Sequence, residues 1–350
     1  GIDANGVPTG LGALGPGPVS SNNEYGQTPD PRSVAPSDLA SQFQDELILG
    51  FEKTLGTQWN AGAKLTLRRL QSAIDDTCDA ARIVEKLQAS GIDPSTVDIP
   101  GCVIFNPGRT NTFQLRHSDG SGYTPVRVSA SDWGFAGRKA RRDYVGVDLF
   151  VEHPMQARWY GRLDYTWSRS FGNTEGQVKS DIGQGDVSKT QDWDAVSLME
   201  YAGGYLANDR RHQLKAYGAW QITPEWMASA TLRVMSGMPR SCLGYYGSEE
   251  SDPLGYGSSY HFCNGQPSRP GDAGRQPWTA RLDLGAMYRP AFAAHRLGLA
   301  VDVFNVLNQR RPLQSEAQYQ SGPYTVSNTY GIGTYFSAPR SVRLSASYDF

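Results

Sequence analysis

The segment 342–350 alternates strictly between apolar and polar side chains. Every second position is apolar, at Val342, Leu344, Ala346, Tyr348 and Phe350. Successive side chains of a β-strand point to opposite faces, so this segment predicts a strand with one apolar and one polar face. A strand of a soluble sandwich can alternate in the same way. However, a chain end tends to fray unless something holds it, so a terminal aromatic residue on such a strand constrains the fold.

Four pairs of segments upstream show the same period of two. The pairs are 47–55 with 59–68, 145–152 with 159–168, 214–222 with 226–234, and 282–288 with 297–303. Each pair predicts a β-hairpin. In the second pair we expect the turn at 153–156, around Pro154. These short connections alternate with long ones near 76–137, 172–210, 238–276 and 311–337.

The second face of these strands is polar, for example at Lys215 and Asp283. In a lipid bilayer, the apolar face of such a strand lies outside and the polar face lines a lumen. Short periplasmic turns and long extracellular loops are also typical of an outer-membrane barrel. Trp59, Trp159 and Trp226 follow short turns, where an aromatic girdle would lie at the periplasmic interface. A soluble barrel has no reason to place tryptophan there three times.

Composition excludes other classes of protein. The mean hydropathy is -0.49, and no run reaches the roughly 18 apolar residues of a membrane helix. The net charge of -2 and the lack of a long basic stripe argue against a nucleic-acid partner. We therefore expect an all-β protein, a transmembrane antiparallel β-barrel in the outer membrane of a Gram-negative bacterium.

Two regions are expected along the chain. Residues 1–43 are rich in Gly and Pro and show neither the period of 2 of a strand nor the period of 3.6 of a helix. This predicts a loop or disordered segment, placed outside the cell. Residues 44–350 carry the barrel strands. The chain opens at Gly1 without an initiator Met or an export segment, so either a signal peptide has been removed or the chain starts within a longer protein.

Several runs resemble TonB-dependent outer-membrane receptors, in particular their Oar-like branch. They are 46–53, 190–194 with 198–200, 208–215, 301–308 and 348–350. The runs Asn-Asp-Arg-Arg-His and Val-Phe-Asn-Val-Leu-Asn are the more specific parts. The resemblance implies a barrel of about 22 strands, occluded by an amino-terminal plug, with uptake driven through the TonB complex. Siderophore, cobalamin, oligosaccharide and peptide receptors share this scaffold.

The terminal strand resembles the assembly signal of outer-membrane barrels, which makes the barrel assembly machinery an expected partner. The residues of this signal are Leu344, Ala346, Tyr348 and Phe350.

The sequence departs from the full receptor pattern. It has about ten strands, no plug and no TonB box, which predicts the carboxyl-terminal part of a monomeric receptor whose TonB contact lies upstream. An unpaired strand edge in hydrocarbon would cost several kcal/mol for each backbone group, so we expect missing upstream strands. The alternative is a small closed barrel, whose narrow lumen would crowd Glu52, Arg162, Asp164, Lys215, Arg233, Arg281 and Asp283. A passive porin and a structural or adhesive barrel remain alternative functions.

The sequence gives little support for a catalytic site or a metal site. The five histidines, His117, His153, His212, His261 and His295, have no second ligand at metal spacing, so neither a metal nor a cofactor is expected. Asp209 with His212 is the one pair that could serve hydrolysis, and a polar strand end is the favoured interpretation. Asn305 and Asn308 are expected to orient a strand end. The protein is not expected to be an enzyme.

Cysteines fall only in long loops. Pairing Cys78 with Cys102 and Cys242 with Cys263 is the arrangement that avoids bridging separate loops. Such loops lie on the oxidising side of the inner membrane, which favours disulfides. Apolar residues at helical spacing predict a short helix over 79–90, ending before Gly91.

Basic residues cluster at the strand ends that carry the long loops. They are Arg68, Arg69, Arg138, Lys139, Arg141, Arg142, Arg210, Arg211, Arg310 and Arg311. Neighbours on a strand face opposite ways, so each pair could send one guanidinium into the mouth and one outward to lipopolysaccharide phosphates. Strand-end charges satisfied by water and loop carboxylates are an equal alternative.

Overall fold

The computed structural model describes residues 30–176, 178–184 and 190–350. Most of the expected loop at 1–43 therefore lies outside the described residues. The chain forms two compact units, which divide it differently from the expected boundary at residue 43. Unit 1 comprises Gly1–Ser41, Ser72–Lys139 and Ser188–Val196, and unit 2 comprises Gln42–Gln71, Ala140–Val187 and Ser197–Phe350.

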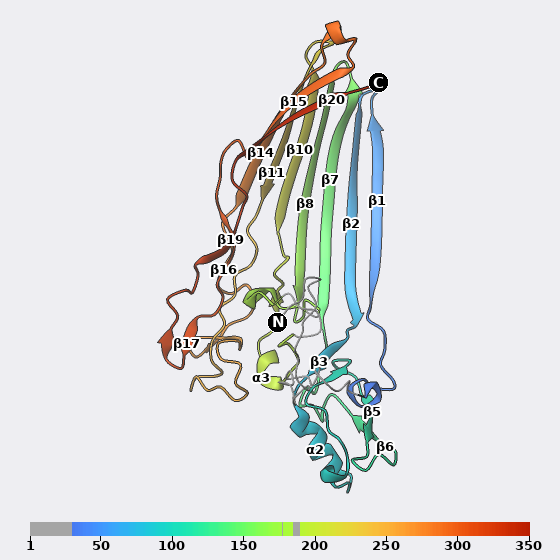
Figure 1. Ribbon diagram of the computed structural model, residues 1–350, viewed down its shortest axis with the longest axis vertical. Helices are drawn as coiled ribbons and strands as arrows, with labels where there is room; N and C mark the ends of the chain where they lie inside the picture. Colours follow the sequence, from blue (N-terminus) through green and yellow to red (C-terminus); the bar gives the residue numbers. More distant parts are fainter. Residues whose placement is uncertain (1–29, 177, 185–189) are drawn as a thin grey trace, which may run out of the picture. The chain divides into compact units, whose positions relative to one another are not determined.

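Unit 2 is built on one long antiparallel sheet (Figure 1). Its strands follow chain order: β1 (Phe43–Leu55), β2 (Trp59–Ser72), β7 (Arg142–Gln156), β8 (Trp159–Gly172), β10 (His212–Gln221), β11 (Trp226–Met235), β14 (Thr279–Tyr288), β15 (Leu297–Phe304) and β20 (Ser341–Tyr348). A tenth strand, β9 (Gly204–Tyr205), pairs with the end of β8. Every long strand contains a segment that the period of two predicts, and the predicted antiparallel fold is confirmed.

The strand register sorts the side chains into one apolar and one polar face. On the apolar face Leu163 lies opposite Ala216, and Leu282 opposite Leu232. No described part of the chain covers this face, since Leu149, Leu284 and Val301 stay more than 40% exposed. Such a continuous exposed apolar face is unfavourable in water and favourable against lipid chains.

Ion pairs connect neighbouring strands on the polar face. Lys64 meets Asp148 at 3.2 Å, Arg162 meets Glu152 at 3.1 Å, and Arg343 meets Asp302 at 2.8 Å. In the part of the chain that the structure describes, β1 and β20 end the strand order and do not pair with each other.

The expected turn at 153–156 is wrong. Strand β7 continues to Gln156, which pairs with Trp159, after a register shift that begins at His153. Ala157 and Arg158 make the turn with φ of 47° and 73°. A two-residue hairpin loop requires this left-handed backbone, which Asn or Gly would signal in a sequence. Pro154 misleads here because it lies in the bulge, where no ladder hydrogen bond is lost.

Aromatic rings gather beside the short turns of the sheet. His153 stacks on Trp159 with 3.7 Å between ring centroids, and Trp59 lies edge-on to both rings. Trp226 stacks on Tyr288 at 4.5 Å. The three girdle tryptophans thus lie at one end of the sheet, which we call the short-turn end. The opposite end, with the long connections, is the loop end.

No helix within the described ranges is long and apolar enough to cross a membrane.

The long connections of unit 2 contain further small elements. They are η2 (Ser180–Ile182), β12 (Phe262–Cys263), β13 (Gln266–Pro267), β16 (Pro312–Ser315), β17 (Gln320–Gly322), β18 (Thr325–Val326) and β19 (Gly333–Phe336). The short connection between β14 and β15 contains η3 (Ala291–Ala293). Helix α3 (Val196–Met199) begins at the last residue of unit 1.

Unit 1 has a hydrophobic core of its own. Its elements are α1 (Pro31–Val34), β3 (Asp75–Thr77), α2 (Ala80–Ala89), η1 (Pro94–Thr96), β4 (Val103–Phe105), β5 (Asn111–Arg116) and β6 (Tyr123–Val128). Phe105, Phe113, Trp133, Phe135 and Trp193 are at most 1% exposed. The sequence predicts one long loop over 76–137, whereas the aromatic residues of this segment build a separate core. The helix predicted over 79–90 is confirmed, and α2 buries Ile83 and Leu87.

Two carboxyl groups of β3, the buried one of Asp75 and the partly buried one of Asp76, make unit 1 sensitive to pH. Burial raises the pKa of Asp75 well above its ordinary value and raises the pKa of Asp76 to about 6. Because the folded state holds these protons more tightly than the unfolded state, its stability is greatest below the unfolded pKa of 3.8 and decreases as pH rises to about 6. Asp76 is partly solvated, so its share is discounted to about 1 kcal/mol.

We therefore expect the opening free energy of α2, from hydrogen exchange corrected for intrinsic rates, to be larger at pH 4 than at pH 7. The Asp76→Asn variant should lose part of this difference, because Asn carries no titrating proton. The same change in opening free energy with pH in the variant and the parent would contradict the assignment to Asp76.

Candidate functional site

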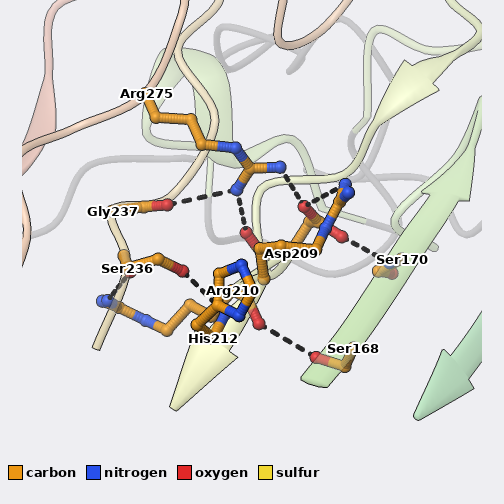
Figure 2. Close-up of polar contacts among 9 residues, drawn as sticks. Ser168, Ser170, Asp209, Arg210, His212, Ser236, Gly237 and Arg275 are labelled. Carbon is orange, nitrogen blue, oxygen red and sulfur yellow. Dashed lines mark hydrogen bonds and ion pairs between the residues drawn. The ribbon is translucent and has the colours of Figure 1, made fainter. Parts of the chain in front are cut away.

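The run 208–212 leads into β10 at the loop end of the sheet. The side chain of Asp209 in this run is fully buried. It accepts a hydrogen bond from the Ser170 backbone N–H at 2.6 Å, and it pairs with the guanidinium groups of Arg211 and Arg275 (Figure 2). Asp209 therefore connects three parts of unit 2, namely the end of β8, the start of β10 and the connection that precedes β14.

Arg275 and Arg210 extend this network to neighbouring backbone groups. Arg275 Nη1 donates to the carbonyl oxygens of Asp209 at 2.8 Å and Gly237 at 3.2 Å (Figure 2). Arg210 Nη1 donates to the Ser236 carbonyl at 3.0 Å, and Ser168 Oγ donates to the Arg210 carbonyl at 2.9 Å. Burial lowers the pKa of Arg210 from its ordinary value, yet a guanidinium stays charged in proteins. These contacts fix the ends of β8, β10 and β11 against one another.

A cavity of about 550 Å³ lies next to this network, and all of its lining residues belong to unit 2. Ser170, Asn208 and Gln276 contribute to its wall, so the Asp209 network supports one side. The charged lining side chains are Arg68, Arg142, Glu175, Asp181 and Arg240. The volume is in the range of cavities that hold small-molecule ligands.

Some charged side chains of this cavity have a side-chain partner among the described residues, and others do not. Arg68 forms an ion pair with Glu46, and Asp181 accepts a hydrogen bond from Ser241 at 2.9 Å. Arg142 Nη1 donates to the Glu175 backbone carbonyl at 2.8 Å. Among the described residues, neither Arg142 nor Arg240 forms an ion pair with a carboxylate. The cavity can therefore offer two guanidinium groups to an anionic or hydrogen-bonding ligand.

The predicted arginines do not form one site. Arg68 and Arg142 line the cavity, and Arg210 and Arg211 belong to the Asp209 network. Others lie elsewhere: Arg69 and Arg141 on the apolar side of the sheet beside Asp143, Arg138 and Lys139 in unit 1, and Arg310 and Arg311 exposed after β15.

The cysteines pair as the sequence analysis expects. Disulfides join Cys78 to Cys102 within unit 1 and Cys242 to Cys263 within unit 2.

The one candidate hydrolytic pair is not assembled. His212 Nδ1 is 2.8 Å from Tyr165 Oη, while the Asp209 carboxylate faces arginines. One metal-type group occurs in the described ranges, Asp76 with Cys78 and Asp194, but the Cys78 sulfur is already in a disulfide.

Asn305 and Asn308 hold the turn after β15. Both have positive φ, 52° and 47°, a conformation that Asn tolerates better than most residues. Asn305 Nδ2 donates to the carbonyls of Gln309 and Ala338, and Asn308 Oδ1 accepts from the Arg340 backbone. At the other end of the same sheet region, Leu344, Ala346 and Tyr348 of the assembly signal pair with β15, and Phe350 follows β20.

Sequence reasoning missed Arg240, Arg275 and Gln276, which complete the network and the cavity. They lie in an aperiodic connection, so no local pattern indicates their direction. The run Arg-Arg at 210–211, next to Asp209, is the signal that could have suggested a further cationic partner.

A long antiparallel sheet with an apolar outer face, a polar inner face and a cavity at its loop end is the arrangement of an outer-membrane β-barrel. No family model matches the chain. The TonB-dependent transporter Oar of Myxococcus xanthus is 27% identical over 276 residues, which cover 77% of this chain and 21% of that protein.

Two solved structures of outer-membrane proteins are similar to the chain, and the first of them supports the fold. The outer membrane transporter YddB from Escherichia coli matches 89% of this chain and 33% of its own, with a TM-score of 0.51 and 13% identity. A ferric enterobactin receptor from Pseudomonas aeruginosa matches 89% of this chain and 32% of its own, with a TM-score of 0.45 and 16% identity.

The resemblance to TonB-dependent receptors of the Oar-like branch is therefore confirmed, and the chain is a β-barrel protein of the Gram-negative outer membrane. The relative from Myxococcus xanthus and YddB are both transporters by name. The chain spans about a fifth of the length of its curated relative.

Proposed function

We propose that this chain is part of a TonB-dependent transporter that takes up a ligand across the outer membrane. The observation that carries the proposal is the loop-end cavity, where Arg142 and Arg240 face no carboxylate partner among the described residues. In the relative from Myxococcus xanthus, transport is TonB-dependent by name. Uptake would draw on the TonB complex of the inner membrane.

The cavity favours a polar ligand with negative charge. Its wall carries the amide side chains of Gln44, Asn208, Gln276 and Gln314, which can donate and accept hydrogen bonds. Arginine binds planar anionic groups in a bidentate manner. Of the four ligand classes, an anionic siderophore or an acidic peptide fits this wall better than a neutral oligosaccharide. We further propose a monomer that the barrel assembly machinery inserts through the terminal strand.

The test is ligand binding to the purified full-length protein. Suitable probes are a ferric catecholate siderophore, cyanocobalamin, a maltooligosaccharide and an acidic tetrapeptide. We expect saturable binding of an anionic probe. The Arg142→Gln/Arg240→Gln variant should bind it at least about tenfold more weakly, since each tenfold corresponds to about 1.4 kcal/mol. The control is Arg289→Gln, a cation paired with Asp349 at the short-turn end, which should bind like the parent.

Unchanged affinity in the double variant would reject the cavity as the binding site. Uptake into cells separates the proposed mechanism from a passive pore. It should stop when the proton-motive force is dissipated, whereas uptake that continues unchanged would favour a porin.

A further inference from the structure

Three exposed arginines form a cluster on the apolar side of the sheet, at the loop end of β2, β7 and β8. They are Arg69, Arg141 and Arg169, and with Phe171 and Asp143 they border a surface groove, here called the arginine groove. Arg69 lies opposite Asp143, and Asp143 lies opposite Phe171. Since side chains alternate between faces, Arg69 shares the face of Leu65 and Leu67, and Arg169 shares that of Tyr165 and Trp167.

The height of these arginines on the sheet matches a membrane interface. On β8, Arg169 lies ten positions after Trp159, which is at the short-turn end. A strand rises about 3.3 Å per residue and tilts by roughly 40° in a membrane barrel, so this distance spans about 25 Å along the bilayer normal. The apolar band of an outer-membrane barrel has about this height. Arg169 therefore lies where the hydrocarbon ends and the headgroups of the outer leaflet begin.

The row of residues directly below is apolar on all three strands. Leu65 lies opposite Val147, which lies opposite Trp167. Leu67 and Val145 also belong to the wall of the groove. A ligand in this groove would thus contact cations at one end and a continuous apolar surface below them. An acyl lipid with an anionic headgroup has charged and apolar parts in the same arrangement.

The geometry leaves hydrogen-bond donors available for an anion. Arg141 uses Nε toward Asp143 Oδ2 at 2.6 Å, and Arg69 Nε lies 3.6 Å from Asp143 Oδ1. Their terminal nitrogens donate to no described residue. Arg169 has no carboxylate partner in the described ranges and lies 4.9 Å from the Phe171 ring centroid. The side chains of Arg69 and Arg141 are 70% and 55% exposed.

We propose that the arginine groove binds a phosphate group of lipopolysaccharide, with the acyl chains of its lipid A part against the apolar row. Arg68 and Glu46 also line the groove and form an ion pair with each other. The remaining three guanidinium groups face two carboxylates, Asp143 and Asp45, which leaves the groove cationic. A phosphate monoester carries up to two negative charges and accepts bidentate bonds from arginine. Of the strand-end arginines that could contact lipopolysaccharide according to the sequence, the site uses Arg69 and Arg141, and it adds Arg169. It requires the outer-membrane location and does not depend on the proposed uptake.

The test measures lipid binding to the full chain extracted from outer membranes in mild detergent. Native mass spectrometry would quantify bound lipid A species for the parent and for the Arg69→Gln/Arg141→Gln/Arg169→Gln variant. We expect the variant to retain at least about tenfold less, because each lost bidentate contact is charge-assisted. The matched control, Arg109→Gln/Arg116→Gln/Arg127→Gln, removes the same charge from exposed positions of unit 1 and should retain the lipid like the parent.

A second variant guards against misfolding of the first. Arg69→Lys/Arg141→Lys/Arg169→Lys keeps the charge but lacks the planar guanidinium groups that form bidentate hydrogen bonds. We expect this variant to lose an intermediate amount of bound lipid. Titration with lipid A and with its dephosphorylated form should show strong binding of the first only. Free inorganic phosphate should not displace it, since it lacks the acyl chains. Equal retention by parent and Gln variant, equal loss in the control, or equal affinity for the dephosphorylated lipid would overturn the proposal.

Discussion

Replacing Asp209 with Asn should loosen the loop end of the sheet more than any other single change to a polar side chain that we consider. The carboxylate is fully buried, and its loss leaves Arg211 and Arg275 without their anion. Removing one partner of a buried ion pair costs about 3–5 kcal/mol. Both arginines are about a quarter exposed and can recruit water, so we expect about 3 kcal/mol.

Hydrogen exchange of the full chain in detergent measures this effect locally. The amides of 205–212 and 236–240 should exchange on the order of 100-fold faster, while those in the middle of β10 and β11 stay protected. Asp349→Asn is the control, because this carboxylate is 64% exposed and its pair with Arg289 contributes at most about 1 kcal/mol. If the two variants behaved alike, Asp209 would not be the centre of the network.

Leu284→Arg should destabilise the protein in a bilayer by about 2–4 kcal/mol. Leu284 lies in the middle of β14 on the apolar face, opposite Ala230 and Val303. A cation on the lipid face near the bilayer midplane costs this much, whereas one on the lumen face does not. The measurement is reversible unfolding from lipid vesicles by guanidinium chloride, with the loss of heat-modifiable gel mobility as a second readout.

The matched control is Thr231→Arg on the opposite face. Thr231 pairs with Asp283, so the new cation would find a carboxylate beside it. We expect a change of less than about 1 kcal/mol. Equal costs for both arginine variants would mean that the apolar face does not contact lipid, and the barrel assignment would fail.

The sequence predicts the long strands and their faces because the information is local. In a strand, the direction of a side chain depends only on whether its position is odd or even. The predicted pairs therefore meet apolar against apolar, such as Leu282 with Leu232, without any knowledge of the partner strand. Chain order then fixes the neighbours, since hairpins joined by short turns pair with each other.

Local information fails where backbone conformation is imposed by the pairing. The turn at Ala157 and Arg158 carries no residue that favours positive φ, so only the register of β7 with β8 places it. Residues 72–139 show a similar limit. Each short element there is too small to signal a domain, and the core of Phe105, Phe113 and Trp133 forms only when the elements pack together.

The residues of the two proposed sites divide in the same way. By itself, the sequence determined the strand segments, the two faces of the sheet, the uneven connections and the basic residues at the strand ends. Only the tertiary structure decided which arginines work together. Asp209 meets Arg275 across 66 positions of the chain, and Arg69 meets Arg141 through Asp143 on the neighbouring strand. Periodicity gives the direction of a side chain but not its distant neighbours, which depend on strand register and loop packing.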